Sequence, residues 1–320
     1  MPASPEDTAS PENTVDVVVV GSLNVDLTAR VRHHPLPGQT VSASALTSTP
    51  GGKGANQAVA AARLGARTAL VGRVGDDAHA DDLLRSLHAD GVDTSHTGSD
   101  PRAPTGTALV TVADSGENAI VVVAGANACL DDGDIDAARQ LLASARVVSL
   151  VLEIPLATVI AAAHAVGANT DAARIVLNLS PVLDVPADVL ALADPLIVNE
   201  HEAHDVLRDN GITAEPGVDQ ASALCRLGAR SAVVTLGANG AALADADQAE
   251  HVPGLPADVV DTTGAGDAFA GTLAWRLSQG DTLSNAARWA VRVSAHSVGH
   301  TGAQASYPTR DELRAAVSRN

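Results

Sequence analysis

Six runs of aliphatic, largely β-branched residues recur along the chain, at 15–22, 68–75, 145–153, 173–180, 194–200 and 230–237. They are apolar at consecutive rather than alternate positions, which is typical of parallel strands buried on both faces. Helix-like stretches lie between them at 56–64, 77–89, 134–144, 156–167, 201–209 and 217–227, and several end near glycine. This alternation predicts an α/β fold, a three-layer Rossmann-like sandwich with a mostly parallel central sheet.

Two regions interrupt this rhythm. Residues 23–48 and 105–123 are rich in Thr and Val and lack a helical period, and they contain the turn signals PLPG and DSGEN. We expect two hairpins that pair with each other in a small β-sheet, which would suit a lid over an active site. The segment TLGANGA at 235–241 predicts a further hairpin turn, and 266–318 is predicted to be mostly helical.

Composition narrows the function. Hydrophobic residues make up 46% and aromatic residues 1%, so we expect an aliphatic core. The formal net charge of −18 disfavours nucleic acid and anionic membranes as partners, and no apolar run reaches the roughly 18 residues of a spanning helix. Residues 1–14 are expected to form a disordered acidic tail before a single domain at 15–320. Cys129 and Cys225 are far apart, which suggests reduced thiols and a cytoplasmic location.

The segment VVDTTGAGDAFAGTLAWRL at 259–277 carries the strongest chemical signal. Gly264, Ala265 and Gly266 precede an amphipathic stretch, so their N–H groups would lie free at a helix N-terminus and could bind an anion. Asp267 falls in the first turn, where Asp also serves as an N-cap. A carboxylate beside an anion cradle suits general-base chemistry better than capping.

Two polar pairs admit both a structural and a functional interpretation. Asn24 and Asp26 follow the first strand and face the same way on an extended chain, where they could bind sugar hydroxyls or form an Asx turn. Asn199 and Glu202 stand three apart at a predicted helix start, which fits a capping box or a polar pair near a metal–nucleotide. His201 and His204 have metal-like spacing without an HExxH motif, and we interpret them as surface residues.

The only lysine in the chain, Lys53, stands between two glycines in TPGGKGANQAVAAARLGA at 49–66. The segment lacks the spacing and the Ser/Thr of a Walker loop.

Together these motifs resemble those of the ribokinase-like (PfkB) carbohydrate kinase family. GGKGANQAVAAARLG resembles its N-terminal signature and DTTGAGDAF its C-terminal one, and further similar segments extend over about 15–318. The resemblance implies ATP-dependent phosphorylation of D-ribose at O5. The alternatives are a kinase for 2-deoxyribose, another pentose or a nucleoside, and a non-catalytic sugar-binding regulator.

The resemblance also implies individual roles. Asp267 would be the catalytic base, and the three residues before it the anion hole. Gly52 and Gly54 would let the backbone pass close to the sugar, and Asn56 would offer an amide to its hydroxyls. Lys53 would reach toward the sugar or the transferred phosphoryl group, where a compact ammonium fits better than a planar guanidinium. The family's lid forms a dimer contact, so a homodimer is implied. The implied ligand sets are Asn24, Asp26, Gly52, Lys53, Gly54, Asn56 and Glu153 for the sugar; Asn199, Thr235, Gly237, Gly240 and Gly266 for ATP; Glu202 for Mg²⁺ through water; and Asp261, Thr263, Ser297, His300, Gly302 and Ser306 for a monovalent cation, K⁺.

Overall fold

The computed structural model describes residues 15–168 and 173–317, so the predicted tail at 1–14 lies outside the described residues. The six apolar runs form neighbouring strands of one large sheet, which confirms the prediction. They are β1 (Val15–Val20), β4 (Thr68–Gly75), β9 (Ala145–Val151), β10 (Arg174–Asn178), β11 (Ala193–Asn199) and β12 (Ala232–Thr235).

The large sheet has the order β14-β13-β12-β11-β10-β9-β1-β4-β5, and β6 also pairs with β4. Strands β13 (Gly240–Ala244) and β14 (Ala249–Pro253) are antiparallel to their neighbours, while β5 (Val92–Asp93) and β6 (Thr97–Asp100) pair parallel to β4. The predicted hairpin at 235–241 is the β12–β13 connection. The strands β5, β6 and β14 escaped prediction because they are short or largely polar.

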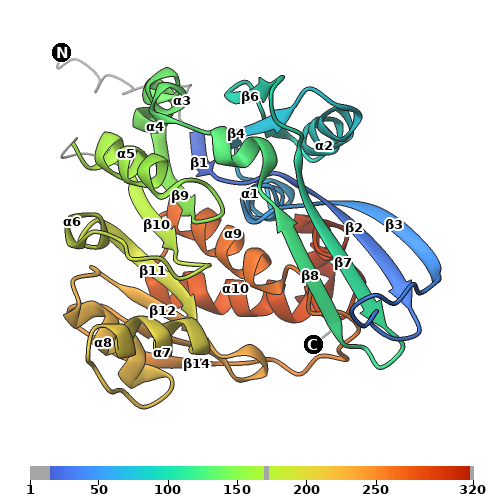
Figure 1. The fold of residues 1–320 in the computed structure, drawn as a ribbon. Coiled ribbons are helices and arrows are strands. Elements are labelled where there is room, and N and C mark those ends of the chain that lie inside the picture. Colours follow the sequence, from blue (N-terminus) through green and yellow to red (C-terminus); the bar gives the residue numbers. More distant parts are fainter. Residues whose placement is uncertain (1–14, 169–172, 318–320) are drawn as a thin grey trace.

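Helices cover both faces of this sheet (Figure 1). Successive residues of a strand point to opposite sides, so Val17 and Val19 belong to one core and Val18 and Val20 to the other. No helix within the described ranges is both long and apolar enough to span a membrane. The first core contains α1 (Lys53–Arg63), α2 (Ala78–Ala89), α9 (Ala265–Ser278), α10 (Leu283–Ser297) and α11 (Arg310–Val317); the second contains α3 (Asp132–Ala137), α4 (Arg139–Ser144), α5 (Leu156–Gly167), α6 (Ala187–Leu190), α7 (Glu200–Asp209) and α8 (Val218–Arg226).

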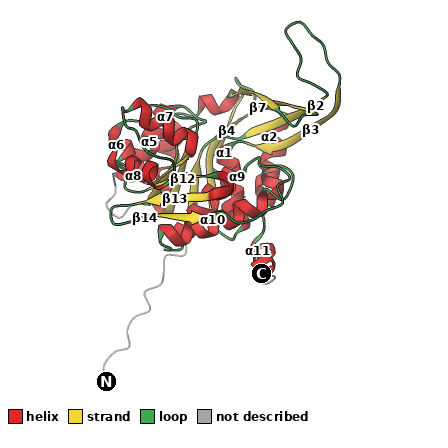
Figure 2. Ribbon diagram, turned by 90° about the horizontal axis from the view of Figure 1, so that it is seen from below, coloured by secondary structure: helices red, strands yellow, loops and turns green. Residues whose placement is uncertain are grey.

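A separate four-stranded sheet contains both regions predicted as hairpins. Its order is β3-β2-β7-β8, formed by β2 (Asn24–Val31), β3 (Ala43–Gly51), β7 (Gly106–Ala113) and β8 (Asn118–Val123). Two antiparallel hairpins join through the parallel pair β2–β7, as expected. Strand β3 extends three residues beyond the predicted end at 48. Figure 2 shows this sheet projecting from the main body.

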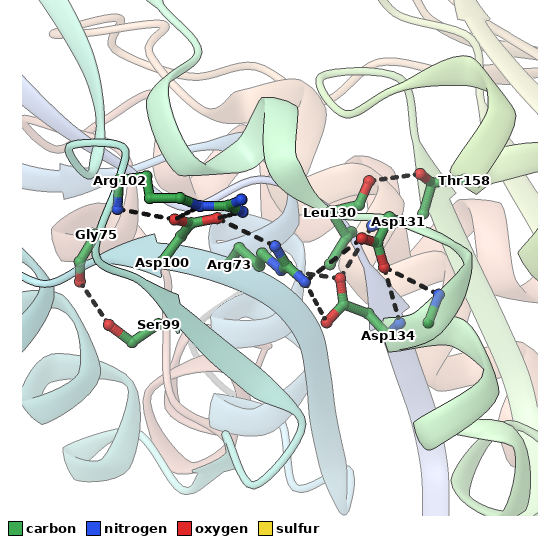
Figure 3. Close-up of polar contacts among 10 residues, drawn as sticks. Arg73, Gly75, Ser99, Asp100, Arg102, Leu130, Asp131, Asp134 and Thr158 are labelled. Atoms are coloured by element: carbon green, nitrogen blue, oxygen red, sulfur yellow. Dashed lines mark hydrogen bonds and ion pairs between the residues drawn. The ribbon is translucent and has the colours of Figure 1, made fainter.

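A charged cluster ties together the segments that lead into and out of the second hairpin (Figure 3). Arg73, on β4, pairs with Asp100 at the end of β6 (3.2 Å) and with Asp134 in α3 (2.9 Å). Arg102, in the β6–β7 connection, donates to both oxygens of Asp100 (3.1 and 2.9 Å). Asp131 lies 3.7 Å from Arg73. We call these five residues the Arg73 cluster.

Candidate active site

The site forms where the N-termini of α1 and α9 meet the base of the small sheet. Both helices belong to the same core, and α1 packs on α9. Asp267, in the first turn of α9, therefore meets residues of the first turns of α1, some 210 positions earlier in the chain. The two signature segments of the sequence thus lie together in the fold.

The start of α9 has the geometry of an anion cradle. Gly264 is the N-cap with φ of 74°, and a Cβ there would lie 2.4 Å from the Tyr307 hydroxyl, which donates to the Gly264 carbonyl (2.9 Å). Gly266 has no heavy atom within 4 Å of the position of a Cβ, so its outer side is open. Ala265 N–H makes a turn bond to the Thr262 carbonyl (3.2 Å). The helix dipole and the remaining first-turn N–H groups favour an anion here.

Asp267 is not an N-cap. Its side chain is 9% exposed, and it accepts hydrogen bonds from Asn56 Nδ2 (2.9 Å) and Gln57 Nε2 (3.3 Å). Burial raises the pKa of Asp267, and the nearby Glu153 adds to this, while Lys53 and the two amides act in the opposite direction. The side chain thus has the environment of a base that is more basic than an exposed aspartate.

Lys53 is the first residue of α1 and lies among carboxylates. Burial would lower the pKa of its ammonium, but the charges of Asp267, Glu153 and Glu202 outweigh this and raise the pKa. Glu153 accepts from Lys53 N–H (3.1 Å) and from the Ser22 hydroxyl (2.6 Å) through the same oxygen, Oε2. Glu153 therefore places its charge at the N-terminus of α1, where the helix dipole favours it.

The glycines around Lys53 also have a structural role in packing α1. A Cβ on Gly54 would lie 2.6 Å from the backbone of Gly21 and Ser22, and one on Gly52, which has φ of 89°, would lie 2.7 Å from Asn24 N. The close approach is therefore between α1 and the chain leaving β1. Because Gly52 and Gly54 have no side chain, the start of α1 can pack directly against the end of the strand, and this packing positions Lys53.

Asn24 and Asp26 lie on β2, at the base of the small sheet, and neither heads an Asx turn. The side-chain oxygen of Asn24, Oδ1, accepts from Asn127 Nδ2 (2.8 Å). Asn127 is a buried residue that sequence reasoning missed. The carboxylate of Asp26 fills the space beside Gly51, where a Cβ would lie 2.3 Å from it. Burial raises the pKa of Asp26 to about 6, and Glu153 and Asp267 contribute to the rise.

A cavity of about 600 Å³ opens on the other side of the α9 N-terminus. Of the residues implied for ATP, Thr235, Gly237, Gly240 and Gly266 line it, whereas Asn199 does not. Pockets of this size and apolar character suit a planar ring with few polar contacts. Its other walls, mostly missed from sequence, are Ala238, Gly254, Leu255, Pro256, Ala257, Val259, Thr262, Ala265, Phe269, Val291, Ser294, Ala295 and Val298.

Asn199 and Glu202 form the capping box that was one of their two interpretations. Asn199 Oδ1 accepts from Glu202 N–H, and Glu202 Oε2 accepts from Asn199 N–H, both at 2.8 Å. His201 and His204 are exposed on the same helix. The described parts of the chain contain no group of three or more His, Cys, Asp or Glu residues arranged to hold a metal ion.

The residues implied for a monovalent cation come from two segments that touch. Asp261 N–H donates to the Val298 carbonyl (3.1 Å), and the Asp261 carboxylate accepts from Gly302 N–H (2.8 Å) and Thr263 N–H (2.9 Å). Burial acts to raise the pKa of Asp261, but these hydrogen bonds outweigh it and lower the pKa. Ser297 and His300 lie next to or within the Val298–Gly302 segment that contacts Asp261, and Ser306 lies four residues beyond Gly302 in the short helix Gln304–Ser306.

Comparison with known proteins decides the family. The model of the pfkB family carbohydrate kinases matches residues 15–310. The chain belongs to this family. A ribokinase of Staphylococcus aureus is 35% identical over 306 residues, covering 94% of this chain and 99% of the relative. A deoxyribokinase of Salmonella typhimurium is 34% identical over 309 residues, covering 96% and 100%.

The fold agrees with a solved structure from the same family. A ribokinase of Arabidopsis thaliana, complexed with ribose and ATP, superposes with a TM-score of 0.85 at 31% identity and covers 95% of this chain and 98% of the other. This confirms the predicted α/β architecture with its additional small sheet.

Proposed function

We propose that this kinase transfers the γ-phosphoryl group of ATP to the 5-hydroxyl of D-ribose. One observation carries the proposal: Ala265 and Gly266, at the start of α9, line the apolar cavity, whereas the next residue, the buried Asp267, bonds to side chains of α1 beside Lys53. A phosphate at the α9 N-terminus would then have the nucleotide on one side and the acceptor hydroxyl on the other. The ribokinase of A. thaliana, whose structure contains ribose and ATP, supports this assignment.

The nucleotide would occupy the cavity. Val291 and Phe269 offer apolar walls for adenine, and Gly237 and Gly240 allow close approach at the β12–β13 turn. The triphosphate would extend toward Gly266, beside which there is open space. Asn199 lies at the N-terminus of α7, and we assign it to the phosphate region rather than to the adenine pocket.

The sugar would bind between the small sheet and the start of α1. Asn24, Asp26 and Glu153 provide amide and carboxylate groups, which suit hydroxyls that both donate and accept. Lys53 adds the one ammonium of the chain. The small sheet would act as a lid that excludes water and so limits ATP hydrolysis.

In the transfer itself, the ribose O5 attacks the γ-phosphorus, the bond to the β,γ-bridging oxygen breaks, and ADP leaves. Asp267 orients the hydroxyl and accepts its proton. The N–H groups at Gly264 and Gly266, and that of Ala265 once it exchanges the Thr262 carbonyl for the phosphoryl group, stabilise the charge that develops on the transferred group. Such an effect is typically worth about 10²–10³ in rate. Positioning and charge stabilisation are the main needs of phosphoryl transfer.

Two cations belong to the proposal. Mg²⁺ would bind with ATP and neutralise phosphate charge, and Glu202 would face its water shell with the oxygen that the capping box does not use. K⁺ would lie at Asp261, whose charge and neighbouring carbonyls form a hard oxygen donor set. Thr263, Ser297, His300, Gly302 and Ser306 would complete that set, several through backbone carbonyls only.

We further propose a homodimer through the small sheet. Its strands expose a group of large aliphatic side chains: Leu46, Leu109, Ile120, Val121, Val122 and Val123 are each between 43% and 70% exposed. By the strand register, four of them share one face of the sheet: Leu46, Leu109, Val121 and Val123. Exposed apolar surface of this kind marks an interface more often than a free face.

The proposed location is the cytoplasm. Cys129 and Cys225 are free thiols, which agrees with a reducing compartment.

The test is an ADP-release assay across pentoses, hexoses and nucleosides with MgATP, with and without K⁺. We expect the highest kcat/KM for ribose and a higher rate with K⁺. The 34% identity with a deoxyribokinase makes 2-deoxyribose the second candidate. A higher kcat/KM for 2-deoxyribose, another pentose or a nucleoside would replace ribose as the substrate. Ribose binding without ADP release would favour a sugar-binding regulator.

A further inference from the structure

Two neighbouring side-chain amides of α1 hold the carboxylate of Asp267. Asn56 Nδ2 donates to Oδ2 (2.9 Å) and Gln57 Nε2 donates to Oδ1 (3.3 Å), so each oxygen has its own donor. Asn56 is 6% exposed and Gln57 is fully buried. Because both donors come from one rigid helix, they fix the plane of the carboxylate relative to α1.

The orientation of the Gln57 amide is fixed in turn by the main chain. Asn178 Nδ2 donates to the Ile197 carbonyl (3.3 Å), which can only accept, so Asn178 presents its Oδ1 to Gln57. Gln57 Nε2 donates to that oxygen (3.0 Å), and Gln57 Oε1 accepts from the Ser149 hydroxyl (2.9 Å). The NH₂ end therefore faces Asp267, and reversing the amide would disrupt this buried network.

Asn56 is oriented by the carboxylate itself, which can only accept when it is ionised. Asn56 Nδ2 therefore faces Asp267, and Asn56 Oδ1 accepts from Gln304 Nε2 (3.0 Å). Gln304 is 3% exposed and lies two residues beyond Gly302, next to the proposed cation loop. The amide of Asn56, implied by resemblance to bind sugar, is thus already engaged with the carboxylate.

The two amides are important because the other groups around Asp267 have opposing effects on its ionisation: some favour the charged carboxylate and others the neutral form. The titratable and charged groups that face it are Lys53 from α1, Glu153 after β9, Asp26 from β2 and Tyr307 after the short helix Gln304–Ser306. Burial disfavours the carboxylate, and a hydrogen bond donated to the charged form favours it. A neutral donor supplies this stabilisation without cancelling the charge.

We propose that Gln57 is a positioning residue for phosphoryl transfer: with Asn56, it holds the Asp267 carboxylate in one plane and in its deprotonated form. This inference rests on the proposed function, because it assigns Asp267 the role of base. Gln57 itself does not reach the substrate. It acts through Asp267 and is supported by Ser149 and Asn178.

The first test is Gln57→Met, which keeps the shape and removes the donor. We expect kcat to fall about 10- to 100-fold, as for other small displacements of a catalytic group. The acidic limb of the kcat–pH profile should move to higher pH, because the lost donor raises the pKa of Asp267. Ser149→Ala is a milder variant that keeps the test available if Gln57→Met does not fold. It should move the acidic limb of the kcat–pH profile in the same direction but by a smaller amount.

Thr158→Val is the matched control. Its hydroxyl is as buried as that of Ser149 and donates to the Leu130 carbonyl (2.7 Å) outside the site, so the variant should lose stability without moving the pH profile. An acidic limb that stays in place in both Gln57→Met and Ser149→Ala would overturn the proposal.

A titration without substrate separates this inference from the proposed function. The ¹³C resonance of the Asp267 carboxyl, assigned by its loss in Asp267→Asn, should titrate at higher pH in Gln57→Met than in the wild type. An unchanged titration would overturn the role of Gln57, whatever the substrate. Absence of kinase activity in the wild type, with the expected shift in titration, would overturn the proposed function alone.

Discussion

Two parts of the molecule hold buried aspartates in opposite ways. In the Arg73 cluster, Asp100 is 2% exposed and pairs with Arg102 and Arg73. The side-chain and backbone hydrogen bonds from Arg102 hold the pKa of that carboxyl well below its usual range. At the site, Asp267 is similarly inaccessible, but its hydrogen-bond donors are the amides of Asn56 and Gln57, and burial raises its pKa.

The difference shows how an aspartate can be fixed without losing its basicity. A guanidinium cancels the charge and makes the carboxylate a poor proton acceptor. An amide orients the carboxylate equally well and leaves its charge in place. The Arg73 cluster therefore suits a structural role at the connections of the small sheet, and the amides suit a base.

The largest expected effect comes from Asp267→Asn. Loss of a general base typically costs about 10²–10⁴ in rate, and we expect kcat to fall at least about 10³-fold. Because the folded pKa of Asp267 is raised, its favourable contribution to stability is present below the unfolded pKa and is lost as pH rises through the folded value. The variant should therefore unfold at higher urea concentration than the wild type at pH 8, but not at pH 3. Normal turnover would remove Asp267 from the role of base.

Lys53→Arg keeps the charge and changes its shape. A planar guanidinium seeks bidentate partners and would pair with the carboxylates of Glu153 or Asp267. That would make this site resemble the Arg73 cluster, so we expect kcat/KM to fall about tenfold or more. Steady-state kinetics of Lys53→Arg and of the wild type test this expected fall in kcat/KM. Unchanged kcat and KM would mean that the lone lysine has no special role.

The pH dependence of sugar binding should follow Asp26. Its pKa of about 6 means that the carboxylate acceptor is lost as pH falls through that value. We expect the KM for ribose to rise below pH 6 in the wild type, and Asp26→Asn to have a high KM that is nearly constant across this range. A wild-type KM that does not change between pH 5 and pH 8 would contradict the role of Asp26.

The smallest effect on activity is expected from Arg73→Met. Asp100 loses one of its two guanidinium partners, so thermal unfolding should occur a few degrees lower at pH 7, with kcat and KM close to wild type. Burial acts to lower the pKa of Arg73, but Asp134, Asp131 and Asp100 outweigh this and raise it, so the contribution of the guanidinium depends on ionised carboxylates and is lost as they protonate in acid. The difference in stability should shrink below pH 4. A large loss of kcat would mean that the cluster acts on the site.

The sequence predicted the large sheet and the helix start that carries Asp267, because both depend on local signals. Consecutive apolar residues marked β4 to the residue, and GAGD marked the start of α9. The predicted helix at 134–144 is two helices, α3 and α4, which meet at Ala138, where the backbone leaves helical geometry. No local pattern marks that break.

The buried amides around Asp267 could not be predicted, because they converge only in the folded chain. Gln57 is 92 residues from Ser149 and 210 from Asp267. Its one signal was its place beside Asn56 in GGKGANQ, where it reads as a polar residue of a helix. The close packing at Gly54 could not be predicted either, because the backbone that it approaches belongs to the end of β1.

The most direct test of the account is to identify the product. Ribose labelled with ¹³C at C5 is incubated with MgATP and the wild-type protein, and with Asp267→Asn as the matched variant, and is followed by ¹³C and ³¹P NMR. We expect the wild type to give a C5 resonance coupled to phosphorus, with equimolar ADP, and the variant to give almost none. A phosphoryl group at another carbon, or equal product from both proteins, would contradict the assignment of Asp267 as the base that activates O5.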